Sequence, residues 1–230
     1  FIREALEDGR SPNTILEKDL MVLGQAIRSA GLASPTAEAR KIAKLYKVPR
    51  VKLGMEFGVA TKFIEDVRAA GTKRSSFHAD VIELVLWTGA RSGEITRVTL
   101  EDIDRKAGCI RLDGKTGPRL VPLSSSLEGP LERLEADALE RGREVLIPGG
   151  MPGLNLMLTR WSKALGVKVT ARGLRHTLAL GLIESKADLS EVRDQLGHKH
   201  ITTTNEYLAP RHLPKSSPLE NLRKHLDPPG

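Results

Sequence analysis

The sequence predicts a mainly α-helical protein that carries one small β-hairpin. Apolar residues recur at the three- and four-residue steps of amphipathic helices over most of the chain, whereas the segment 109–123 has the pattern of two short strands. The 230 residues, 40% of them hydrophobic, can bury a core in one large domain or two small ones. This composition excludes an intrinsically disordered or collagen-like chain.

The N-terminal segment, residues 1–52, is expected to be a small helical unit. Asn13 can cap a first helix that runs to about Gly31. Its apolar face is formed by Leu16, Leu20, Leu23 and Ile27. A second helix is predicted to begin at Ser34 and to end before Pro49.

A larger body, residues 57–208, is predicted to follow a connection that is rich in glycine and proline. Helical spacing returns over residues 59–67 and again over residues 79–87. Gly89 ends the second of these helices, and Ser92 is expected to cap the next one.

The segment 109–123 predicts a β-hairpin. Short apolar runs on either side flank the sequence Asp113-Gly114-Lys115-Thr116-Gly117-Pro118, which is rich in turn-forming residues. The number of such residues predicts a loop longer than two residues.

From about Leu127 onward the chain is predicted to be helical again. One helix is expected to begin near Thr170, which places Arg172 and Arg175 three residues apart with both side chains pointing the same way. Two like charges on one face repel unless an anion joins them, so this pair is either an anion site or two solvated arginines.

The next helix is predicted to start at Asp188, where Glu191 completes a capping box, and to end at Gly197. A short helical stretch with Tyr207 follows. Of the two tyrosines in the chain, Tyr46 lies on an apolar helical face and is expected in the core. Tyr207 is left as the tyrosine with polar neighbours, Asn205 and Glu206.

One interval of the chain carries basic residues without any acidic residue to offset them. The chain has 36 Lys and Arg against 29 Asp and Glu, a net charge of +7, yet no acidic residue lies between Glu144 and Glu184. This interval favours an anionic partner such as a DNA backbone, although a buried apolar helix would lack acids too. Aromatic residues make up only 3%, which argues against a platform that stacks single-stranded bases.

Several classes of protein are excluded by what the sequence lacks. No run approaches the roughly 20 apolar residues of a membrane span, and no basic-then-apolar leader opens the chain. A single cysteine, Cys109, predicts neither disulfides nor a thiolate metal site, and favours a reducing compartment such as the cytoplasm. The chain starts with Phe1 rather than methionine, which is expected of a fragment.

No cofactor or metal is expected. Gly114-Lys115-Thr116 looks like the end of a phosphate-binding loop, but Cys109 stands where that motif needs a glycine. His198 and His200 form a closely spaced pair without a third ligand at a diagnostic spacing.

Four motifs together resemble those of the tyrosine recombinase, or phage integrase, family. In order they are Thr88-Gly89-Ala90-Arg91-Ser92-Gly93-Glu94, the hairpin from Gly114 to Leu123, Gly173-Leu174-Arg175-His176-Thr177, and Leu196-Gly197-His198 with Tyr207 nine residues after the histidine. The resemblance covers about residues 59–210. It implies the catalytic-domain fold of that family over residues 57–208, preceded by a short, truncated or reduced core-binding segment and followed by a tail, residues 209–230.

The resemblance also implies a catalytic set, namely Arg91, Lys115, Arg172, Arg175, His198 and Tyr207. Tyr207 would attack a DNA phosphorus and form a 3′-phosphotyrosyl bond, without metal or ATP. Lys115 would protonate the leaving 5′ oxygen, while Arg91, Arg175 and His198 would bind the phosphate oxygens. Candidate DNA contacts outside this set are Arg119, Arg160, Lys163 and Lys168.

One position departs from the family pattern. The family usually has His-x-x-Arg where this chain has Arg172-Gly173-Leu174-Arg175. Because arginine stays charged and only donates hydrogen bonds, Arg172 is no ordinary general base. Either Arg172 favours the tyrosinate electrostatically while water or the phosphate takes the proton, or the site is impaired. His176 is expected to point away from Arg175, and we do not assign it the missing role.

The expected function is that of a site-specific recombinase that integrates or excises a mobile element in a prokaryotic cytoplasm. Its expected partners are double-stranded DNA and further copies of the chain, a tetramer at synapsis with exchanged tails, with an accessory DNA-bending protein. The alternatives are a type IB topoisomerase, a telomere resolvase, or a catalytically silent sequence-specific DNA-binding relative.

Overall fold

The computed structural model describes residues 15–32, 54–114, 117–198 and 204, apart from the side chains of Leu16 and Glu17. The chain divides into two compact units, Phe1–Arg50 and Val51–Gly230. The predicted cap at Asn13, the predicted helix from Ser34 and the tail 209–230 lie outside the described residues.

In the first unit, a π-helical turn, η1 (Ile15–Asp19), leads into α3 (Leu20–Ser29). The predicted first helix is therefore confirmed over its described part, and it ends in a turn at Gly31. Leu20 is buried, whereas Leu23, at the same helical spacing, is 39% exposed. An apolar residue at helical spacing is buried only where another element covers that face.

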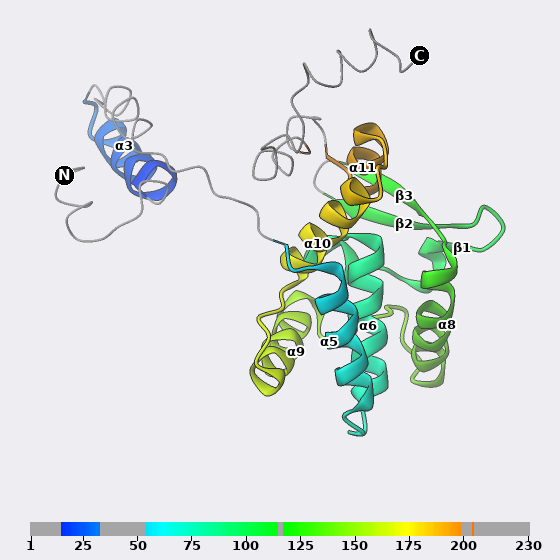
Figure 1. The fold of residues 1–230 in the computed structure, drawn as a ribbon. Helices are drawn as coiled ribbons and strands as arrows, with labels where there is room; N and C mark the ends of the chain where they lie inside the picture. The colour runs from blue at the N-terminus through cyan, green and yellow to red at the C-terminus, as the bar shows by residue number, and fades with distance from the viewer. Residues whose placement is uncertain (1–14, 33–53, 115–116, 199–203, 205–230) are drawn as a thin grey trace, which may run out of the picture. The chain divides into compact units, whose positions relative to one another are not determined.

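The second unit contains most of the described helices and a small sheet (Figure 1). Its elements are α5 (Phe57–Ala69), α6 (Ser75–Thr88), α7 (Ser92–Ile95), η2 (Leu100–Asp102), β1 (Ile103–Asp104), β2 (Cys109–Gly114), β3 (Gly117–Pro122), α8 (Ser125–Glu140), α9 (Gly150–Leu165), α10 (Ala171–Glu184) and α11 (Leu189–Leu196). The expected mainly α-helical fold with a small sheet is confirmed.

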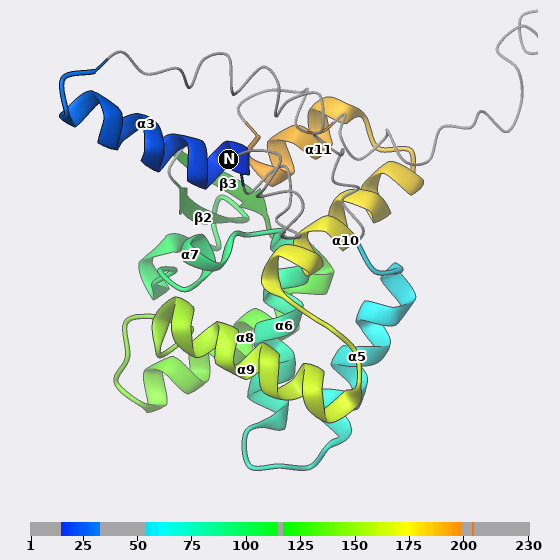
Figure 2. The same cartoon turned by 90° about the vertical axis from the view of Figure 1, so that its left-hand side faces the viewer.

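Helix α6 forms the centre of the core. It packs against α5, α8 and α10, and Figures 1 and 2 show it between α5 and α8. Its fully buried side chains point in all directions around the axis and include Val81, Ile82, Leu84, Val85 and Leu86. A helix that is apolar all round is stable only when other elements enclose it, which places α6 in the interior.

The one buried acid of α6 is held by two arginines. The Asp80 carboxylate accepts hydrogen bonds from Arg68 of α5 at 2.7 Å and from Arg133 of α8 at 2.7 and 3.0 Å. A buried carboxylate must be paired to be tolerated, so this network fixes α5 and α8 against α6.

The sheet is antiparallel with the order β1-β2-β3. The predicted hairpin is confirmed, but pairing continues to Gly114 opposite Gly117 and leaves only two residues between the strands. The longer loop was therefore a wrong expectation: the two glycines have no side chains and can continue the ladder into the turn. Strand β1 was not predicted, because two residues are too short to show a period.

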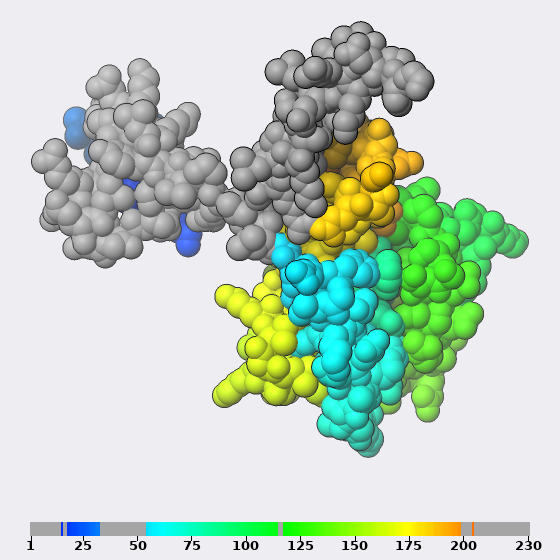
Figure 3. Space-filling model, in the orientation of Figure 1, coloured from blue at the N-terminus to red at the C-terminus, as the bar shows by residue number. Residues whose placement is uncertain are grey.

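The surface on one side of this unit is formed by α5 and α9, which lie side by side (Figure 3). Helix α9 ends at Gly166, and α10 begins after the N-cap Thr170, whose hydroxyl accepts the Gly173 N–H at 2.9 Å. The predicted start of α10 is thus confirmed. Among the described helices none is both long and apolar enough to cross a membrane.

Candidate active site

Arg91 directly follows the turn that ends α6. It is the N-cap of α7, and its backbone N–H donates to Oε2 of Glu94 at 3.0 Å. Ser92 was expected to cap this helix, but the cap lies one residue earlier. Glu94, three residues after Arg91, completes the capping box with Arg91. The Arg91 guanidinium donates to Oε1 of Glu94 at 2.6 Å and remains 42% exposed, so a ligand can reach it.

Glu94 is buried beneath this end of the hairpin. Burial raises the pKa of its carboxyl, but hydrogen bonds from Arg91 and the charges of Arg119 and Arg91 outweigh burial, and the pKa lies below its usual value. Glu94 is therefore ionised at neutral pH. Glu94 is the last residue of the first motif but was assigned no role; its spacing of three residues from Arg91 is the sequence signal for the contact.

Arg175 lies in α10 and is 5% exposed. Its guanidinium donates to the carbonyl of Gly89 at 2.6 Å and to the carbonyl of Leu196 at 2.6 Å. Gly89 lies two residues before Arg91, and Leu196 lies two residues before His198. Arg175 therefore brings three of the four sequence motifs together.

His198 directly follows Gly197, the C-cap of α11. This helix has its N-cap at Asp188 and ends at Gly197 as predicted. Gly197 has φ 64°, a left-handed conformation that glycine adopts without strain and that turns the chain off the helix axis. The imidazole Nδ1 of His198 lies 3.0 Å from Oγ1 of the buried Thr204. Thr204 had no sequence signal, because a threonine next to polar residues looks like an ordinary surface position.

Arg172 and Arg175 are not in the same environment. Arg172 is exposed on the first turn of α10, and its Nε–H donates to Nε2 of His176 at 3.3 Å. The helical spacing was right, but the expected common face divides into a buried and an exposed position because other segments cover only Arg175. His176 lies beside Arg172, one turn along the same helix.

Lys115 and Tyr207 lie outside the described residues, but the ends of the turn that holds Lys115 are placed. A Cβ atom on Gly114 would lie 2.7 Å from Oε1 of Glu94. The carbonyl of Asp113 accepts a hydrogen bond from Arg97 at 2.6 Å. The last residue before Lys115 is therefore fixed beside the carboxylate that holds Arg91.

The four candidate DNA contacts fall into two groups. Arg160 and Lys163 are exposed on α9, and Lys168 is exposed in the loop after it. Arg119 is only 11% exposed, and its guanidinium is used inside the protein, by the carbonyl of Gln195 at 2.5 Å and by Glu94 at 3.1 Å. Burial lowers the pKa of Arg119, while the charge of Glu94 acts in the opposite direction.

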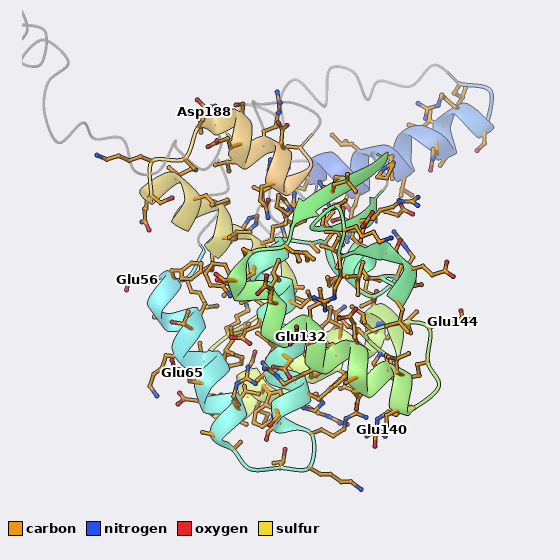
Figure 4. All side chains as sticks on the ribbon, turned by 90° about the vertical axis from the view of Figure 1, so that its right-hand side faces the viewer. Glu56, Glu65, Glu132, Glu140, Glu144 and Asp188 are labelled. Atoms are coloured by element: carbon orange, nitrogen blue, oxygen red, sulfur yellow. The ribbon has the colours of Figure 1, made fainter. Side chains whose placement is uncertain are left out.

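Acidic and basic side chains are segregated between helices. Helix α9 contains no acid, whereas Glu132 and Glu140 lie along α8 and Glu144 follows that helix (Figure 4). A polyanion would therefore be attracted to α9 rather than α8.

Within the part of the chain that the structure describes, no cluster of three or more His, Cys, Asp or Glu could hold a metal ion.

Comparison with known proteins gives this arrangement its family. Residues 61–212, more than half of the chain, match the Phage integrase family. The chain belongs to the phage integrase family. Tyrosine recombinase XerC of Roseiflexus sp. (strain RS-1) is 28% identical over 156 residues, which cover 61% of this chain and 50% of the relative. Tyrosine recombinase XerC of Corynebacterium efficiens is 27% identical over 97% of the chain and 75% of the relative.

The chain thus spans half the length of the Roseiflexus relative that it matches. A solved structure with the same fold is the Tn1549 transposon integrase in complex with circular intermediate DNA, with a TM-score of 0.73 and 18% identity over 98% of this chain and 82% of that one. The family resemblance and the catalytic-domain fold inferred from the four motifs are both confirmed.

Proposed function

We propose that this phage integrase family member is a site-specific recombinase that breaks and rejoins duplex DNA through Tyr207. The observation that carries the proposal is the position of Arg175, which joins the segments of Arg91 and His198 by hydrogen bonds of 2.6 Å to Gly89 and Leu196. Arginine and histidine are the nitrogen donors that bind phosphate oxygens, and Arg175 ties together the segments that carry Arg91 and His198. The Tn1549 integrase, which shares the fold, was solved with DNA.

The reaction needs a nucleophile, charge neutralisation and a proton donor. The Tyr207 oxygen attacks phosphorus, the bond from phosphorus to the 5′ oxygen breaks, and Lys115 gives that oxygen a proton. Arg91, Arg175 and His198 stabilise the negative charge that grows on the non-bridging oxygens. The 3′-phosphotyrosyl bond conserves the energy of the broken linkage, so attack by another 5′ hydroxyl rejoins DNA without ATP.

Arg172 changes how Tyr207 loses its proton. Its guanidinium cannot accept a proton, but a positive charge nearby favours the tyrosinate form, and water or the phosphate then takes the proton. Its exposed position in the first turn of α10 leaves it accessible to DNA. Should Arg172 instead have silenced the site, the chain would bind DNA without forming a covalent bond.

Binding to the duplex is assigned to the basic side chains of α9 and the loop that follows it. Arg160, Lys163 and Lys168 contact the DNA backbone in this proposal, because they are exposed and no acid lies on α9. The protein acts on DNA in a prokaryotic cytoplasm as a tetramer at synapsis, with tails exchanged between subunits and an accessory bending protein. Deleting residues 213–230 should weaken recombination more than DNA binding; equal losses would contradict tail exchange.

Covalent capture tests the proposed function. The protein is incubated with fragmented candidate host and element DNA in EDTA, denatured and isolated, and any attached DNA is sequenced. We expect adducts with wild type and none with Tyr207→Phe, and the sequences then give the cleavage site. Good duplex binding without adducts would show a catalytically silent DNA-binding protein instead.

A further inference from the structure

The side chain of Arg119 connects elements that carry different members of the predicted catalytic set. Its Nη1 donates to the carbonyl of Gln195 at 2.5 Å, three residues before His198. Its Nη2 donates to Oε2 of Glu94 at 3.1 Å, and the same carboxylate binds Arg91. Arg119 itself belongs to β3, the strand that follows the hairpin turn.

Arg119 points into the protein although it is charged. Side chains alternate between the two faces of a strand, and Arg119 shares its face with the fully buried Val121, while Leu120 between them is 63% exposed. A Cβ atom on Gly197 would lie only 2.4 Å from Cδ of Arg119. The stem of the side chain is therefore packed against the residue that precedes His198.

The other end of this connection reaches the turn that contains Lys115. Glu94 lies so close to Gly114 that a Cβ atom there would be 2.7 Å from its Oε1. One carboxylate thus contacts the last residue before Lys115, the guanidinium of Arg91 and the guanidinium of Arg119. A shift of Glu94 would therefore change the packing against Gly114, the residue at the start of the turn.

The described contacts of Arg119 use its two terminal nitrogens and leave Nε over. Its Nε–H is buried and has no hydrogen-bond partner among the described residues. A buried donor without a partner costs stability, and such groups in folded proteins call for another explanation. The two bonds that Arg119 does make both lead toward the catalytic residues.

We propose that Arg119 is a positioning residue for strand cleavage, which anchors the hairpin to α11 and to Glu94 and so holds Lys115 at the scissile phosphate. This inference rests on the proposed function and assigns Arg119 a role other than the DNA contact expected from the sequence. Loss of Arg119 should displace the proton donor more than the arginines that bind the phosphate, because Arg91 keeps Glu94 and Arg175 keeps its two carbonyls.

The test compares two leaving groups on DNA of the captured cleavage sequence, one with the natural bridging 5′ oxygen and one with sulfur in its place. A thiol is much more acidic than an alcohol, so a sulfur leaving group departs without a proton from Lys115. Single-turnover cleavage is measured for wild type, Arg119→Gln and Arg119→Lys in the full chain. Arg111→Gln is the matched control, since Arg111 lies on the exposed face of the same hairpin and pairs with Asp113.

We expect Arg119→Gln to slow cleavage of the oxygen substrate by about ten- to a hundredfold, the scale of loss from misplacing a reacting group by about 1 Å. The sulfur substrate should restore most of that rate. Arg119→Lys should show the same selective loss to a smaller degree, since lysine keeps the charge but not the fork that reaches two acceptors. If Arg119→Gln does not fold, the comparison of the two substrates is made with Arg119→Lys. Arg111→Gln should match wild type on both substrates.

Equal losses on the two substrates, or no loss, would overturn the role of Arg119 while wild-type adducts still support the proposed function. Wild-type protein that forms no adduct on either substrate would refute both the function and the role that depends on it. Whether wild-type protein forms adducts therefore distinguishes the two failures.

Discussion

The guanidinium of Arg175 and the carbonyl of Leu196 are joined by a hydrogen bond of 2.6 Å across 21 positions of sequence. With the second bond from Arg175 to Gly89, this contact fixes the ends of α6 and α11 against α10. Local sequence preferences cannot bring these three segments together. The buried arginine therefore has two tasks, holding the segments and presenting a positive charge.

Arg175→Lys should separate these two tasks. Lysine keeps the charge but cannot reach both carbonyls in a fixed fork, so a buried carbonyl loses its partner. We expect the free energy of unfolding to fall by about 1–3 kcal/mol in urea titrations. Arg172→Lys, at an exposed position of the same helix, should change it by less than about 0.5 kcal/mol. Similar effects of the two variants would contradict the bridging role of Arg175.

Glu94→Gln should make stability less dependent on acid pH. The pKa of Glu94 is lowered in the folded protein, so its ionised form contributes stability that is present above its unfolded pKa of about 4.3 and is lost as the pH falls through the lowered folded value. Urea titrations should show wild type more stable than Glu94→Gln at pH 7, with a difference that shrinks below about pH 4. A difference that stays constant or grows on acidification would show that the ion pairs do not hold this carboxylate.

Arg172→His should raise the rate of covalent adduct formation, because histidine can accept the proton of Tyr207 whereas arginine cannot. The rate of the variant should also fall as the pH drops through about 6.5, the ordinary pKa of histidine. The test measures single-turnover cleavage by Arg172→His from pH 5.5 to 8.5. Wild type and Arg172→Lys, in the same buffers, are the controls. An unchanged rate and pH profile would place position 172 away from the reacting atoms.

His78 should report its own titration through Trp161. The indole N–H of Trp161 donates to Nδ1 of His78 at 3.1 Å, and this bond requires an unprotonated Nδ1. Burial and the charge of Arg74 lower the pKa of His78 below its ordinary value of 6.5. Stability linked to His78 is therefore present above about pH 6.5 and lost as the pH falls through the lowered value.

Fluorescence tests this prediction directly. With Trp87→Phe as background, Trp161 emission should titrate with a midpoint below 6.5, and His78→Gln should abolish the transition. A midpoint above 6.5 would mean that the pair is solvated rather than buried.

The features that the sequence predicted well are those set by neighbouring residues. The capping box from Asp188 to Glu191, the cap at Thr170 and the hairpin all depend on side chains within a few positions of each other. The helix stops at Gly89 and Gly197 were predicted for the same reason, because a left-handed residue there ends a helix locally.

The features that were missed depend on distant segments. Arg119 was expected at the DNA because it is basic and lies in the hairpin, yet the strand turns it inward and Leu120 outward, against their hydropathy. Only the contacts with Glu94 and Gln195 make the buried position favourable, and these lie 25 and 76 residues away in sequence. Arg172 and Arg175 differ for a similar reason, since coverage by other segments decides which arginine is buried.

The proposed function depends most directly on a covalent bond between Tyr207 and DNA. Trypsin should release Tyr207 in the peptide His200–Arg211, which contains no other tyrosine, so mass spectrometry of the digested and nuclease-trimmed adduct can locate the bond. We expect this peptide to carry a nucleotide attached through its 3′ phosphate, and the signal to vanish in Tyr207→Phe. A nucleotide on any other peptide, or an adduct that persists in Tyr207→Phe, would contradict the account.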